Sequence, residues 1–145
     1  MKIVDKILDI LNSMSDVETV LYESSFGVNI RLDRRPTPAA IVYLLQNFDI
    51  DLSSGLRKDY VDVEVFFCTR CDFAAKGEEI KGVMETLEPT VDEFVSRVLA
   101  DKSMVLEGDK VSVTTAYGSF DCNVCGWSLQ MKVGDKQGRC VGTEA

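Results

Sequence analysis

The sequence predicts an α+β fold, an antiparallel or mixed sheet with an N-terminal helix and a long, proline-interrupted helix packed on one face. Two segments carry apolar residues at helical spacing, and several short segments alternate apolar and polar residues as strands do. The strands are mostly adjacent in the chain, and the helices are too few to cover both faces of a sheet.

Length and composition predict a single domain. The chain has 145 residues, of which 46% are hydrophobic and 28% charged, so it is long and apolar enough to bury one core. We expect this domain to cover residues 1–133. Residues 134–145 are expected to form a disordered tail, because they offer no apolar face to bury.

The N-terminal region predicts a helix followed by a β-hairpin. Apolar residues recur at intervals of three and four over residues 3–14, which predicts an amphipathic helix. Residues 17–22 are β-branched and apolar, and residues 26–32 alternate apolar and polar side chains. With a turn at residues 23–25, these two segments are expected to pair as a hairpin.

The middle of the chain predicts two further strands. The prolines within residues 34–38 disfavour both helix and central strand, which predicts an extended surface connection. Residues 39–45 are compatible with helix or strand, and their β-branched and aromatic content favours strand. Residues 47–58 are expected to form a loop, although its first residues alternate apolar and polar and could form a short strand. Residues 60–68 carry the clearest strand pattern.

The C-terminal half predicts a long helix and two strands. Apolar residues keep helical spacing over residues 77–100, and Pro89 is expected to kink this helix or to start a second segment near Thr90. Residues 111–117 and 125–133 alternate as the last two strands.

Charge and hydropathy exclude several partners. Sixteen basic residues against 24 acidic ones give a formal net charge of -8, which repels nucleic-acid phosphates. No apolar stretch approaches the roughly 18 to 20 residues needed to span a bilayer, and early aspartates interrupt any signal-peptide core. We therefore expect a cytoplasmic protein that binds neither nucleic acid nor membrane.

The sequence contains no recognisable catalytic apparatus. Histidine is absent, which excludes histidine-dependent triads and histidine-ligated zinc hydrolases. The phosphate-binding, dinucleotide-binding and nucleophile-elbow glycine motifs are absent as well. We expect a binding or assembly protein with no catalytic residue and no cofactor.

Five cysteines carry the sharpest local signal. Cys68-x-x-Cys71 and Cys122-x-x-Cys125 could supply four thiolates to a tetrahedral zinc, and Gly126 after the second pair is similar to the glycine of a zinc knuckle. Buried core thiols are the favoured interpretation, because cysteines three apart in a strand point to opposite faces. Cys140, in the predicted tail, is the thiol expected to react most readily.

With the strand at residues 60–68, the helix at residues 77–100 and the closing strand at residues 125–133, the sequence resembles prophage tail-terminator or tail-completion proteins, which join phage head to tail. The likeness covers most of the chain in element order. It implies a ring-shaped homo-oligomer on the end of the tail tube, with tail or neck proteins as partners and no catalysis. It also implies a location in the host cytoplasm or the virion.

Two functional hypotheses therefore remain. The first is a phage-type assembly protein with buried thiols, whose subunit contacts are expected in the loops at residues 31–38 and 47–58. The second is a binding module of unknown partner, stabilised by a zinc ion on the four paired cysteines. The first predicts self-association and neighbouring genes for tail and capsid parts, whereas the second predicts bound metal and unfolding by a chelator.

Overall fold

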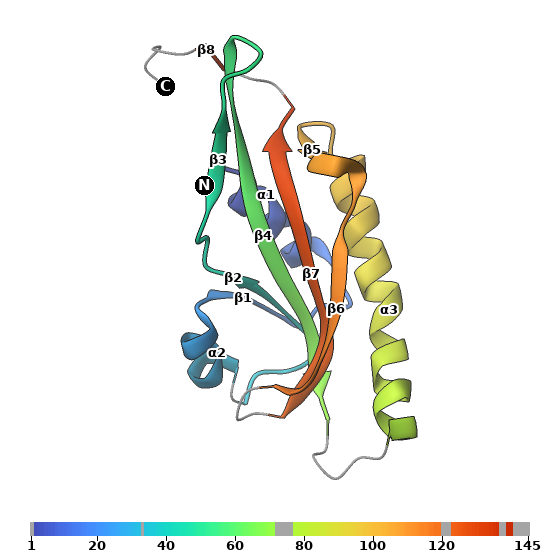
Figure 1. Cartoon of the computed structure of the whole chain (residues 1–145). Coiled ribbons are helices and arrows are strands. Elements are labelled where there is room, and N and C mark those ends of the chain that lie inside the picture. The colour runs from blue at the N-terminus through green and yellow to red at the C-terminus, as the bar shows by residue number, and fades with distance from the viewer. Residues whose placement is uncertain (1, 33, 72–76, 120–122, 137–138, 141–145) are drawn as a thin grey trace.

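A mixed β-sheet forms the centre of the protein, with helices on both of its faces (Figure 1). The computed structural model describes residues 2–32, 34–71, 77–119, 123–136 and 139–140. The arrangement confirms the predicted α+β class. In chain order the elements are α1 (Lys2–Ser13), β1 (Thr19–Glu23), α2 (Ser25–Leu32), β2 (Ala39–Tyr43), β3 (Phe48–Asp51), β4 (Leu56–Arg70), α3 (Gly77–Ala100), β5 (Met104–Leu106), the 3-10 turn η1 (Glu107–Asp109), β6 (Ser112–Ser119), β7 (Val124–Asp135) and β8 (Arg139–Cys140).

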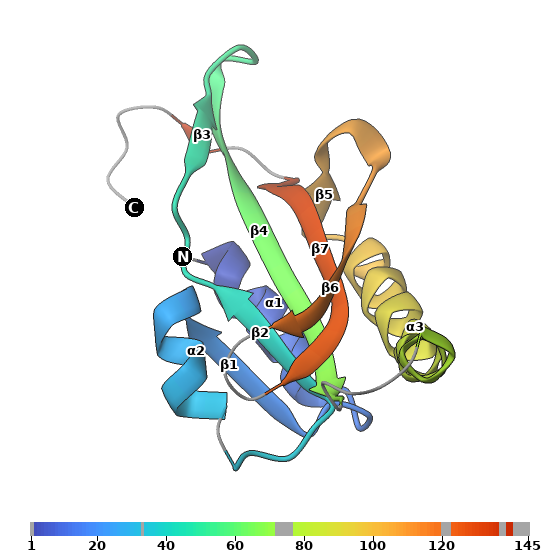
Figure 2. The same ribbon diagram turned by 60° about the horizontal axis from the view of Figure 1, so that its bottom comes forward.

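The long antiparallel pair of β4 and β7 is the axis of the sheet, in register from Tyr60 opposite Gly134 to Arg70 opposite Val124. On the far side of β4, β2 pairs antiparallel and β1 then pairs parallel with β2. Strands β5 and β6 share the outer side of β7. The first part of β4 pairs with β3, and this hairpin extends past the rest of the sheet (Figures 1 and 2).

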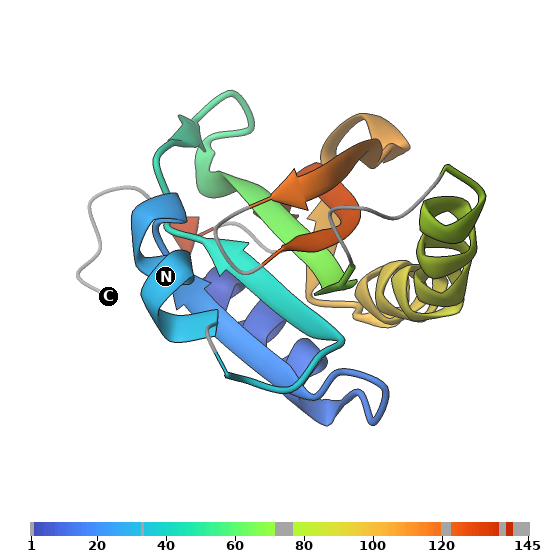
Figure 3. The same cartoon turned by 90° about the horizontal axis from the view of Figure 1, so that it is seen from below.

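Successive residues of β4 point into two different cores. Val65 and Phe67 join a core with α1 and α3, whereas Phe66 and Cys68 join a second core with α2. Figure 3 shows α2 and α3 on opposite sides of β4. The prediction that the N-terminal helix and the long helix share one face is therefore confirmed, and α2 adds a helix on the other face.

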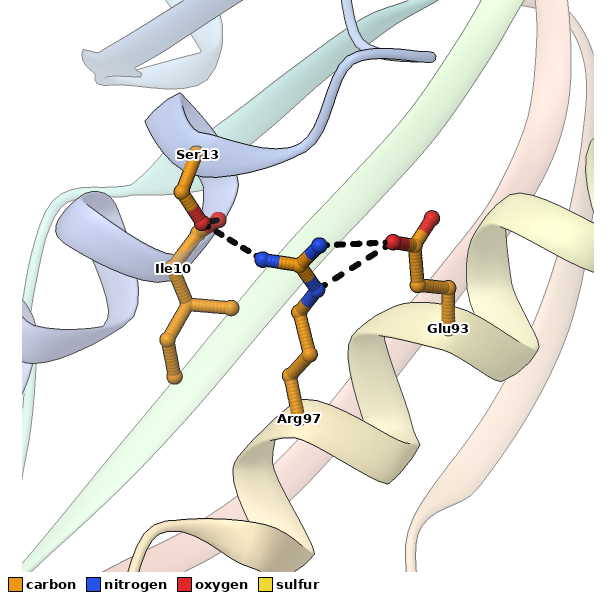
Figure 4. Close-up of polar contacts among 4 residues, drawn as sticks. All are labelled: Ile10, Ser13, Glu93 and Arg97. Atoms are coloured by element: carbon orange, nitrogen blue, oxygen red, sulfur yellow. Dashed lines mark hydrogen bonds and ion pairs between the residues drawn. The ribbon is translucent and has the colours of Figure 1, made fainter.

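A polar clasp joins α1 to α3 at the surface of the first core. Nη1 of Arg97 donates a hydrogen bond to Oγ of Ser13 at 2.7 Å, and Nη2 of Arg97 forms an ion pair with Oε1 of Glu93 at 2.8 Å (Figure 4). The Ser13 hydroxyl in turn donates to the carbonyl of Ile10 at 2.7 Å. One guanidinium thus ties together two helices that are distant in the sequence.

The predicted hairpin is wrong, because residues 26–32 form helix α2 instead of a strand. An alternating pattern also places apolar residues four apart, and Val28 and Leu32 are both fully buried one turn apart. Ser24 caps this helix, since its Oγ accepts the amide of Gly27 at 3.1 Å and its carbonyl accepts the amide of Val28 at 3.1 Å. The helical crossover allows β1 and β2 to run parallel.

Of the two effects predicted for Pro89, the start of a second helical segment is wrong. Helix α3 runs continuously through Pro89, and no second segment begins near Thr90. Pro89 lies on the exposed side of the helix, as does Glu85 one turn earlier, whose carbonyl loses its amide partner. Water can therefore satisfy that carbonyl, while Thr90 and Val91 continue the buried stripe.

The remaining strand predictions hold, with two omissions. Residues 39–45 contain strand β2, and the short strand considered within residues 47–58 is β3. The three-residue strand β5 was not predicted. The predicted boundary at residue 133 is wrong, because β7 runs to Asp135 and β8 pairs with Leu56 and Arg57 of β4. These pairings use backbone hydrogen bonds, which require no apolar side chains.

Candidate functional site

A polar groove of about 980 Å³ lies on the sheet face that carries α2, beside that helix. Its borders are the connection between β2 and β3 at residues 44–47 and the turn η1 that precedes β6. We call it the acidic groove. The charged and amide side chains that line it are Gln46, Asn47, Asp62, Glu64, Glu107, Lys110, Gln130 and Lys132.

The groove follows from strand alternation and register. Val63 and Val65 of β4 point into the core beneath α1 and α3, so Asp62 and Glu64 point to the opposite face. Register places Lys132 of β7 opposite Asp62, and Gln130 opposite Glu64. Helix α2 has only eight residues and covers the far half of this face, so these side chains remain open to solvent.

Three carboxylates and two ammonium groups line the groove, namely those of Asp62, Glu64, Glu107, Lys110 and Lys132. The ammonium of Lys132 bonds to Asp49 and lies 3.6 Å from Oε2 of Glu107. The hydrogen bond with Asp49, together with the charges of nearby carboxylates, raises the pKa of Lys132 above its usual value. Asp62 accepts a hydrogen bond from Nδ2 of Asn47 at 2.9 Å. The lining carboxylates outnumber the lining ammonium groups by three to two, and the ammonium of Lys132 is shared between Asp49 and Glu107, so the groove is acidic on balance.

Glu64 and Tyr43 lie at the end of the groove nearest α2. Oε1 of Glu64 accepts hydrogen bonds from Ser128 at 2.9 Å and from Gln130 at 3.5 Å. Burial, the Glu64 charge and Cys68 together raise the pKa of Tyr43 to about 12. The phenol is therefore neutral at physiological pH, and carboxylate oxygens define the chemistry of this end. Such an arrangement suits a cationic, hydrogen-bonding partner.

A second notable surface lies on the projecting hairpin. Phe48, Ile50 and Leu52 are 46%, 47% and 53% exposed, and we call these three residues the apolar arm. Phe48 pairs with Val61, whose side chain points into the core beneath α1 and α3. The apolar face of the sheet thus continues along β3 and the residue after it, beyond the helices that cover its centre (Figure 2).

The described cysteines do not share one face. Cys68 is buried in the core beneath α2, while Cys125 is buried opposite Thr69 and therefore points to the other face. Cys71 forms a side-chain hydrogen bond with Cys125, so it lies on the Cys125 face. Cys122 and the Cys140 side chain lie outside the described parts. Within those parts, no three Cys, Asp or Glu residues are grouped to hold a metal ion.

Cys125 makes stability depend on alkaline pH. Burial, together with a hydrogen bond that the thiol donates to Cys71 and the charge of Cys71, raises the pKa of its thiol from 9.0 to about 12. The unfolded chain therefore loses this proton first, so stability present below pH 9 should fall as pH rises toward 12. Between pH 8 and pH 10.5 we expect a loss of about 2 kcal/mol from this group.

The measurement is urea unfolding under reducing conditions at both pH values, for the natural chain and for Cys125→Ala. Other groups also titrate in this range, so the difference between the two proteins isolates the thiol. Equal pH dependence in both proteins would contradict the assignment.

The sequence predicted subunit contacts in the loop at residues 47–58, which contains the apolar arm. It did not predict the acidic groove. The polar positions in β4 and β7 were visible as alternation, whereas their pairing depends on strand register. No described helix is long and apolar enough to cross a membrane. No protein-family model matches the sequence, and no significant match to a curated protein is found. The acidic groove and the apolar arm are therefore the two candidate functional surfaces.

Proposed function

We propose that this chain is a non-enzymatic assembly protein of phage type, similar to the tail-terminator and head-to-tail joining proteins that oligomerise at the end of the tail tube. The observation that carries the proposal is the apolar arm. The partners of the protein are further copies of the chain and tail or neck proteins. The protein is located in the host cytoplasm or in the virion.

Two features support assembly through the arm. Its three large apolar side chains form a row on a hairpin that projects from the sheet. Within the described residues β3 pairs with β4 alone, so its outer edge presents unused backbone donors and acceptors. Exposed apolar surface on an open strand edge favours association with another chain. The row therefore fits a surface that becomes buried when a partner docks.

The zinc-stabilised module gains no specific support. It requires Cys68 and Cys125 to reach one metal ion, yet they point to opposite faces of the same strand pair. Their burial instead fits the core-thiol interpretation of these two residues.

The arm can be tested with the double variant Phe48→Ser, Ile50→Ser. Because these side chains are about half exposed, the two changes together should cost only about 2 kcal/mol of stability, and the variant should remain folded. Self-association and binding to assembled tail tubes should weaken at least about tenfold, because buried aromatic and aliphatic anchors carry most interface energy. Sedimentation velocity and co-pelleting with tubes measure both effects.

The matched control is Leu99→Ser, which removes an exposed apolar side chain from α3. Equal behaviour of this control and the arm variant would count against the arm. The function itself is tested by deleting the gene from its prophage. Heads and tails should then fail to join, and the natural chain but not the arm variant should restore them. Normal virions from the deletion would refute the proposed function.

A further inference from the structure

A basic turn follows α2, and it consists of Arg34 and Arg35. Both residues are exposed, and Arg34 has a left-handed backbone with φ of 62°. Arg35 donates its amide to the carbonyl of Leu32 at 3.0 Å, which closes the turn. Nη2 of Arg70 then donates to the carbonyls of Leu32 and Arg35 at 3.2 and 3.0 Å. The turn is therefore held in one conformation, with two guanidinium groups presented to solvent.

No carboxylate within the described residues forms an ion pair with Arg34 or Arg35. Arg31, one turn earlier in α2, is already paired with Glu23 at 3.4 Å. The turn thus concentrates positive charge on a chain whose net charge is -8. Two copies of such a chain repel each other at long range, so a contact between them must bring opposite charges together locally.

The acidic groove offers the complementary charge at the other end of α2. Ser24, which caps the start of this helix, lines the groove, while Arg34 follows the last turn of the helix. Eight helical residues separate the two sites by about 12 Å along the helix axis. Because the turn is held at its own end of α2 by Arg70, it does not reach the groove of the same copy.

We propose that the acidic groove of one copy binds the basic turn of a second copy, head to tail. This inference rests on the proposed function and specifies its self-contact. Arginine side chains suit the site, because each guanidinium can pair with a carboxylate through two parallel hydrogen bonds. Asp62 and Glu107, which both line the groove, are the acceptors. When two copies join in this way, the turn of one copy and the groove of the other stay unoccupied. Further copies can bind there, so the contact propagates into a ring or a filament.

The test uses two charge-reversed variants of the full chain. The turn variant is Arg34→Glu, Arg35→Glu, and the groove variant is Asp62→Lys, Glu107→Lys. At low salt, sedimentation velocity should show species larger than dimers for the natural chain. Each variant alone should associate at least about tenfold more weakly, because its one contact now brings like charges together. High salt should weaken the natural assembly as well, since exposed charges are screened.

One mixture and one combined variant make the test specific to a head-to-tail contact. The turn variant keeps a normal groove for the normal turn of the groove variant, and its reversed turn is complementary to the reversed groove of the groove variant. An equal mixture should therefore form alternating species larger than dimers, although each variant alone does not. A chain that carries all four changes has both charges reversed, and it should assemble again. The control is Lys2→Glu, Lys102→Glu, which makes the same charge change as the turn variant at two exposed positions elsewhere. This control should assemble like the natural chain, and circular dichroism verifies that every variant is folded.

The outcomes separate this inference from the proposed function. Assembly of either charge variant alone at natural strength, a monomeric natural chain at low salt, or an equal mixture that stays monomeric would each overturn the head-to-tail contact. If the arm variant still loses binding to tail tubes in those cases, the proposed function keeps its support. If the natural chain neither associates nor binds tubes, both proposals fall.

Discussion

Replacing Gly126 with alanine is expected to unfold most of the protein. A Cβ at this position would lie 1.8 Å from the carbonyl oxygen of Phe67 and 2.8 Å from the Cα of Cys68. These are backbone atoms of β4, so no side-chain rotation relieves the clash, and the central strand pair must separate locally. We expect a loss of at least about 4 kcal/mol, which is a large part of the stability of a typical domain.

Urea unfolding followed by circular dichroism measures this loss, and Gly82→Ala is the matched control. Gly82 is exposed within α3, and a Cβ there would meet no atom within 4 Å. Alanine at this position should therefore stabilise the helix by about 0.5 to 1 kcal/mol. A Gly126→Ala protein with natural stability would show that β4 and β7 are not packed as closely as described.

The second large effect is expected from Phe67→Ala, which should cost about 3 to 5 kcal/mol. Phe67 is fully buried, and its ring lies 5.3 Å from the ring of Phe94 at a tilt of 58°. This contact joins β4 to α3 at the centre of the larger core, and that distance and tilt are favourable for aromatic pairs. Removing the ring leaves a cavity that neither the sheet nor the helix can fill.

Unfolding of Phe67→Ala, Phe94→Ala and the double variant forms a thermodynamic cycle. The sum of the stability losses of the two single variants should exceed the loss of the double variant by about 0.5 to 1.5 kcal/mol. This difference is the energy specific to the ring pair. Phe48→Ala removes the same group from an exposed position and should change stability by only about 0.5 kcal/mol. Equal losses from Phe48 and Phe67 would contradict the placement of the core.

Gly126 illustrates why spacing motifs can mislead. In the sequence it completes a zinc-knuckle pattern with Cys122 and Cys125, in which a glycine frees backbone amides for sulfur. In the structure a glycine is required because the backbone of the neighbouring strand β4 lies too close to position 126 to leave room for a side chain. The same residue type satisfies either requirement, and only the position of a strand distant in the sequence distinguishes them.

Sequence patterns correctly predicted the helices and strands whose apolar residues follow a single periodicity. The helix at residues 77–100 and the strand at residues 60–68 were found because their apolar residues fit one periodicity over many positions. The short segment at residues 26–32 failed, because its apolar residues fit both a strand and a helix. Its Ser24 cap and the contact of Val28 and Leu32 with the second core decided in favour of helix.

Composition and periodicity were therefore sufficient for the α+β class, the main helices and the principal strands, because these depend on which face of each segment must leave water. The acidic groove, the face on which each cysteine lies and the parallel pairing of β1 with β2 depend on register and on the short length of α2. Those properties arise from contacts between segments far apart in the chain, and a pattern read along one segment carries no information about its partner.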